Sequence, residues 1–241
     1  ALFGALLATA SATQADIVVD YTIDSGGSNP YGPSGLAAQG TFSVDGDQLR
    51  IVLTNTSTDV PTDASVADSL LVSLGFELDG ATIASGDSAV IADGSVGLGL
   101  WSHLGAGDSV ASEWLWTNEA GGDVLKSWHQ IISTSQGYGG GDAWDFNGSP
   151  TPGVSGPFGG IAADPALLTV PESQYAVSDT IVFQLTLSRS ITDGELALLA
   201  QSSIVEFGSD YQYLAVPAPG ALAFIALAGL TTRRRRTMRQ T

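Results

Sequence analysis

The 241-residue chain contains no cysteine. Without thiols it cannot form a disulfide framework, use a thiolate as a nucleophile or bind a metal through a thiolate. Only two histidines occur, His103 and His129. The stability of the fold must therefore come from its packed core.

Basic residues are scarce in the body of the chain. All 25 acidic residues lie between Asp16 and Tyr213, where the only bases are Arg50, Lys126 and Arg189, and five arginines near the C-terminus bring the net charge to −17. A surface this acidic repels nucleic acids and anionic membranes. We therefore expect no nucleic-acid partner.

The signals for catalysis are weak. Ser102 precedes His103, but neighbours on a strand point to opposite faces, and the chain has no G-x-S-x-G motif. Glu113 is the glutamate that best fits a glycosidase, yet the sequence offers no second carboxylate across a cleft. We predict a protein that is not an enzyme and assign no catalytic residue.

Short alternations of apolar and polar residues predict β strands along the body. They run through Ile17–Ile23, Leu70–Leu78 and Ile181–Leu187. Phe42 and Val44, then Leu49, Ile51 and Leu53, flank Asp45-Gly46-Asp47, which is typical of a hairpin turn. A shorter strand is expected within Val110–Trp116, and Gly194–Ala200 fits either a helix or a strand.

Many short strands separated by turn residues favour an antiparallel fold. We predict residues 16–213 as one all-β domain, an antiparallel β-sandwich of jelly-roll-like form. A signal-peptide helix in residues 1–15 precedes it, and a short C-terminal hydrophobic helix follows within residues 214–241.

A long glycine-rich segment, Gly137–Pro165, offers a weak calcium candidate. Asp142, Asp145 and Asn147 bring several oxygens together, but the EF-hand pattern fails at two ligand positions, which hold Ala143 and Val154. Ordinary turn chemistry explains the same residues. We predict no cofactor, with calcium as the one alternative.

The five tryptophans lie within one stretch of the chain, Trp101, Trp114, Trp116, Trp128 and Trp144. Trp114 and Trp116 are two residues apart and so share a strand face. Large aromatics usually fill a core, which is the favoured interpretation. The alternative is a carbohydrate-binding face formed by Trp114, Trp116 and Trp144, of which Trp144 is expected to be the most exposed.

The first 15 residues have the character of a secretory signal peptide. An apolar stretch is followed by small residues, with Ala10-Ser11-Ala12 fitting a cleavage site. Because there is no initiator Met and no basic leader, we expect the start of this signal to be truncated.

The C-terminal segment has three parts. Val216-Pro217-Ala218-Pro219 is followed by the apolar run Gly220–Leu230 and then by Arg233–Arg236. The run is marginal for a bilayer, which needs about 30 Å of helix. The arginines would stay on the cytoplasmic side and act as a membrane stop. A permanent single-span anchor is the alternative to removal of the tail.

These three parts, in this order, resemble the PEP-CTERM protein-sorting tail. The resemblance covers only Val216–Arg236. It implies export in a Gram-negative bacterium, transient insertion in the inner membrane, and removal of the tail by an exosortase-type membrane protease. Delivery to the cell surface or extracellular matrix would follow, with exopolysaccharide as a candidate partner. Ala218 stands where the family most often has glutamate, so the exosortase variant is not indicated.

Together these features predict an exported, non-catalytic surface or matrix protein. The main alternative is a carbohydrate-binding module with solvent-facing tryptophans.

Overall fold

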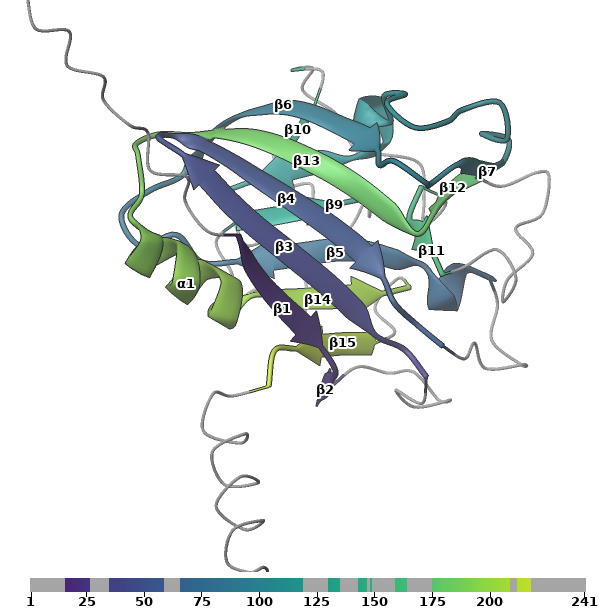
Figure 1. Cartoon of the computed structure of the whole chain (residues 1–241), viewed down its shortest axis with the longest axis horizontal. Helices are drawn as coiled ribbons and strands as arrows, with labels where there is room; N and C mark the ends of the chain where they lie inside the picture. The colour runs from purple at the N-terminus through teal and green to yellow at the C-terminus, as the bar shows by residue number, and fades with distance from the viewer. Residues whose placement is uncertain are drawn as a thin grey trace, which may run out of the picture.

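The computed structural model describes residues 16–26, 35–58, 66–118, 130–134, 143–146, 148, 159–163, 175–208 and 212–217. Within these ranges the chain forms mostly β strands, with one α-helix and two short 3-10 helices. The strands make a five-stranded and a ten-stranded sheet. Figure 1 looks onto the five-stranded sheet, with strands of the other sheet behind it. The predicted all-β class is confirmed as two mainly antiparallel sheets, whereas both predicted terminal helices lie outside the described residues.

The five-stranded sheet follows the alternation seen in the sequence. Its order is β1 (Ile17–Tyr21), β3 (Ala38–Asp45), β4 (Gln48–Asn55), β13 (Thr180–Leu187) and β6 (Ile83–Ile91), and all neighbours are antiparallel. Ile181, Phe183 and Leu185 of β13 are buried, while the residues between them are partly exposed. One face of this sheet therefore packs into the core and the other meets solvent.

The ten-stranded sheet is built around β5 (Leu71–Phe76), which pairs with β9 (Gln130–Ser133), β11 (Ile161–Ala162) and β14 (Ile204–Phe207). The other members are β10 (Trp144–Asp145), β8 (Leu115–Thr117), β12 (Tyr175–Ser178), β7 (Gly97–Gly99), β15 (Gln212–Ala215) and β2 (Ile23–Gly26). β11 and β12 are parallel, unlike the other described pairs. Residues of both sheets share one main hydrophobic core.

The predicted hairpin at Asp45-Gly46-Asp47 is confirmed. Asp45 of β3 pairs with Gln48 of β4, which leaves Gly46 and Asp47 as a two-residue loop. Gly46 has φ of 65°, and a glycine at the first loop position is the signature of a type II′ hairpin turn.

β5 departs from its predicted pattern in its first half. Alternation predicted one shared face for Leu70, Val72, Leu74, Phe76 and Leu78. Leu74, Phe76 and Leu78 do enter the main core, but Leu70 and Val72 pack in a separate cluster. The register of β14 against β5 shifts between Glu206 and Phe207. Such a bulge turns the residues beyond it to the opposite face.

The segment that fitted either helix or strand is helical. α1 (Asp193–Ser202) begins with a capping box, in which Thr192 Oγ1 accepts from Glu195 N and Glu195 Oε2 accepts from Thr192 N. Leu196 and Leu199 attach the helix to the core. None of the helices in the described part of the chain is long and apolar enough to cross a bilayer.

The strand predicted within Val110–Trp116 is wrong in its first half. A single 3-10 turn, η2 (Ala111–Glu113), comes first, and β8 begins only at Leu115. The second 3-10 helix, η1 (Val66–Ser69), leads into β5.

Candidate functional site

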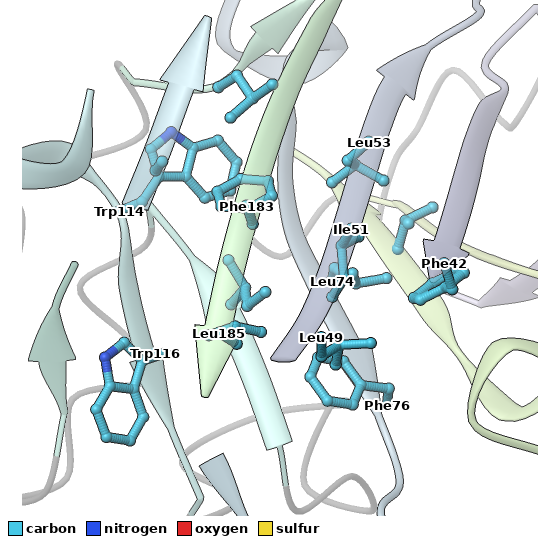
Figure 2. Close-up of a cluster of buried hydrophobic side chains, with 14 of the residues drawn as sticks. Phe42, Leu49, Ile51, Leu53, Leu74, Phe76, Trp114, Trp116, Phe183 and Leu185 are labelled. Carbon is cyan, nitrogen blue, oxygen red and sulfur yellow. The ribbon is translucent and has the colours of Figure 1, made fainter. Parts of the chain in front are cut away.

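Trp114 and Trp116 do not form a ligand platform. Trp114 is fully buried and Trp116 is 8% exposed, and both belong to the main core. Figure 2 shows Trp114 against Phe183 of the facing sheet, with ring centroids 4.8 Å apart in an edge-on arrangement. Both side chains therefore supply core packing, as the favoured interpretation expected, and the alternative of a ligand-binding role does not fit these two residues.

Trp144 is the partly exposed member of the predicted set, at 38%. It is paired in register with Trp116, on the edge strand β10.

The predicted calcium ligands are only partly described. Asp145 is 6% exposed, and its carbonyl oxygen accepts from Gly148 N at 3.1 Å. Asp142 and Asn147 lie outside the described residues, so the calcium site stays a prediction. Elsewhere in the described part of the chain, no group of three acidic or histidine side chains could hold a metal ion.

The structure describes two of the residues considered for catalysis, His103 and Glu113. His103 is exposed, and its Nδ1 lies 3.1 Å from the carbonyl oxygen of Leu100. Glu113 is partly buried, and the loss of water around its carboxyl raises its pKa. His129 lies outside the described residues.

A buried polar row crosses the large sheet. Ser133, Ser73, Glu206 and Tyr213 occupy directly opposed positions on β9, β5, β14 and β15. Ser73 Oγ donates to Glu206 Oε2 at 2.7 Å, and Tyr213 OH donates to Oε1 at 3.2 Å. Because Ser73 has only one hydroxyl hydrogen, Ser133 must donate across their 2.7 Å contact. Glu206 is fully buried, so the row joins four adjacent strands inside the protein, where a ligand cannot reach it.

A shallow hollow of about 550 Å³ lies beside the turn after β5. Its amide side chains are already engaged. Asn118 donates to and accepts from the backbone of Ile83 at 2.8 Å, and Gln130 Oε1 accepts from Leu78 N. These two amides therefore order the protein backbone beside the hollow.

A second hollow, of about 520 Å³, lies on the solvent face of the five-stranded sheet. Like the first hollow, it is shallow and open to solvent. Three valines in register form the floor, since Val52 pairs with Val182 and Val182 pairs with Val90. This hollow is the candidate functional site.

Polar side chains border the valine floor on both sides along the strands. Thr54 and Thr180 are opposed on one side, with hydroxyl oxygens 2.9 Å apart. Arg50 lies on the other side, two residues before Val52 on β4, and Asp93 lines the hollow from the turn after β6.

The loop before η2 forms the remaining wall. Gly107 N donates to the carbonyl oxygen of Ile91 at 2.9 Å, and Ile91 N donates to that of Asp108 at 3.0 Å. These bonds hold the loop against the edge of β6. Gly107 has φ of 85°, a conformation that glycine adopts without steric cost.

Arg50 forms no ion pair or hydrogen bond with any described residue. Its cross-strand neighbours, Ser43 and Gln184, are neutral. Two carboxylates elsewhere on this sheet face, on β1 and β6, accept hydrogen bonds from neutral donors. Asp20 accepts from Gln39, and Asp87 accepts from Ser85 and Thr186. The guanidinium is therefore free to bind a ligand.

Sequence reasoning missed this site, although one signal was present. Arg50, Val52 and Thr54 alternate with the buried Leu49, Ile51 and Leu53, so they had to share the exposed face of their strand. Arg50 is also one of only three bases in the acidic body. The strands that complete the hollow, however, come from distant parts of the chain.

The predicted sorting motif begins where the described fold ends. β15 stops at Ala215, and the side chain of Val216 packs against the main core. Val216 and Pro217 are partly exposed. Ala218, Pro219 and the predicted membrane stop, Arg233, Arg234, Arg235 and Arg236, lie outside the described residues.

No protein-family model, curated protein or solved structure matches the chain.

Proposed function

We propose that the protein is an exported, non-catalytic component of the cell surface or extracellular matrix, processed at a C-terminal sorting signal. The observation that carries this proposal is the order of the tail. Val216–Pro219, the apolar run and Arg233–Arg236 follow the last strand directly. In this proposal an exosortase-type membrane protease cuts the chain after transient insertion in the inner membrane of a Gram-negative bacterium.

The position of the fold within the chain supports the same proposal. β1 begins at Ile17, just after the proposed signal peptide, and β15 ends two residues before Pro217. Removal of both proposed sorting segments would leave every described strand and helix intact. We interpret the two sheets as a jelly-roll-like sandwich that is exported as one unit.

Of the three tryptophans considered for carbohydrate binding, only Trp144 is exposed to solvent. With Trp114 and Trp116 in the core, a row of solvent-facing tryptophans is not formed by these three residues. Any binding of exopolysaccharide would need other side chains.

The intact mass of the protein recovered from its native host tests the processing. We expect a mature chain that ends near Val216–Pro219. A chain that retains Arg233–Arg236 would mean a permanent anchor and would refute removal of the tail.

A paired substitution tests the role of the prolines. Replacing Pro217 and Pro219 by Ala should leave the protein uncut and bound to the membrane. Replacing Pro61 by Ala, outside the proposed motif, is the matched control and should leave processing unchanged. Release of the double variant at the wild-type mass would contradict the sorting proposal.

A further inference from the structure

We propose that the hollow around Arg50 binds a sugar acid, a polyhydroxylated ligand with a single carboxylate. This proposal does not depend on processing of the tail. It rests on one geometric relationship, a free guanidinium and a pair of threonine hydroxyls on opposite sides of a valine floor. Arg50 and Thr54 are four residues apart on β4, so their Cα atoms are about 13 Å apart. One or two sugar units can span that interval.

The guanidinium selects the anionic group of the ligand. Arginine presents a planar fork of donors that matches the two oxygens of a carboxylate. In many acidic proteins such a fork would be occupied by a neighbouring Asp or Glu. Here the cross-strand neighbours Ser43 and Gln184 are neutral, and among the described residues Arg50 has no ion pair, not even with Asp93 in the same hollow. The fork is therefore available.

The charge of the protein limits how many anionic groups the ligand carries. The chain has 25 acidic residues, and Asp93 lines the same hollow as Arg50. A polyanion would meet repulsion outside the reach of one guanidinium. A ligand with one carboxylate can place it on Arg50 and direct its neutral groups toward Asp93.

The rest of the hollow suits the hydroxyls and C–H faces of a sugar. The Asp93 carboxylate accepts hydrogen bonds from hydroxyls. Thr54 and Thr180 can each donate or accept, and one of their two hydroxyl hydrogens remains free because they share a single bond. Val52, Val182 and Val90 give a flat apolar surface for the C–H groups. A simple carboxylate would use only the guanidinium.

The test compares three probes on the full chain, held in a polyoxyethylene detergent that carries no sugar. The probes are cellobiouronate, the neutral disaccharide cellobiose, and acetate. We expect cellobiouronate to bind with a Kd about tenfold or more below that of either other probe. Backbone amide shifts should concentrate at Val52, Thr54, Thr180 and Val182. Equal binding of cellobiose, tighter or equal binding of acetate, or shifts elsewhere would overturn the proposal.

Substitutions on the same exposed face separate the roles of the groups. Arg50→Gln should abolish the preference for cellobiouronate over cellobiose, and Arg50→Lys should retain part of it because the charge remains without the fork. Thr54→Val should weaken both disaccharides and leave acetate unchanged. Val18→Thr, on β1 outside the hollow, is the control and should alter nothing. An unchanged preference in Arg50→Gln, with a native amide spectrum, would refute the site.

Discussion

Arg189 Nη2 and Glu195 Oε1 form an ion pair with a separation of 2.6 Å. The same guanidinium donates to the carbonyl oxygens of Asp79 and Gly80, so the turn after β5 is tied to the first turn of α1. Glu195 also accepts from the backbone and side chain of Thr192. The hydrogen bond from Arg189, followed by those from Thr192, lowers the pKa of Glu195 to about 2.

Glu195→Gln should lower the melting temperature at neutral pH and have little effect in strong acid. Because the pKa of Glu195 is lower in the folded protein than its ordinary value of 4.5, its charge stabilises the fold above about pH 4.5. That stabilisation is lost as the pH falls through about 2. Thermal unfolding of both proteins between pH 7 and pH 2 measures the difference.

Asp16→Asn is the charge-matched control, since it removes the same charge from an exposed residue. Its difference from the wild type should be smaller at pH 7. An equal effect of the two substitutions would attribute the loss to overall charge rather than to the contacts of Glu195.

Gly86→Ala should destabilise the protein by roughly 1–3 kcal/mol, the usual cost of overpacking a core. A Cβ at Gly86 would lie 2.5 Å from Trp116 Cδ1 and 2.9 Å from Phe146 Cδ1. Gly105→Ala is the control, because no atom lies within 4 Å of the added carbon. Urea unfolding should separate the two variants, and equal stabilities would contradict the packing of Trp116 against β6.

Ser73→Ala should cost about 1–3 kcal/mol of unfolding free energy, since it leaves buried oxygens of Glu206 and Ser133 with one partner fewer. Tyr213→Phe removes another donor to the same carboxylate. The two effects should not add, because both donors serve one carboxylate. A double-mutant cycle by urea unfolding checks this, with Gln39→Ala as a distant partner whose effect should add to that of Ser73→Ala.

The elements that could be predicted are those set by local pattern. Alternation in Ile181–Leu187 and the turn residues at Gly46 specify β13 and the β3–β4 hairpin without knowledge of distant partners. Thr192 and Glu195 have the T-x-x-E spacing of a capping box, a local signal for a helix start that the apolar pattern of Gly194–Ala200 alone does not provide. The division of β5 between two clusters was not, because the bulge arises from pairing with β14, more than 120 residues later in the chain.

The candidate site also depends on how strands that are distant in the sequence align with one another. The exposed side of Arg50 follows from alternation within β4. The valine floor, however, requires Val182 to oppose both Val52 and Val90, and no local pattern specifies this alignment. For the tryptophans, the local pattern indicates a shared face but not whether that face is buried. Their two-residue spacing gives Trp114 and Trp116 a shared face, but only the packing of the sheets determines that this face is buried.

Gly46→Ala should destabilise the β3–β4 hairpin by about 1–2 kcal/mol, the cost of a left-handed conformation for an L-residue. Gly46 has φ of 65°, whereas the adjacent Asp47 is not among the residues with positive φ. Asp47→Ala is therefore the control and should have a smaller effect, because its backbone oxygen still accepts from Leu187 N. Chemical denaturation provides the two unfolding free energies. If Asp47→Ala cost as much as Gly46→Ala, side-chain contacts rather than backbone conformation would limit this turn.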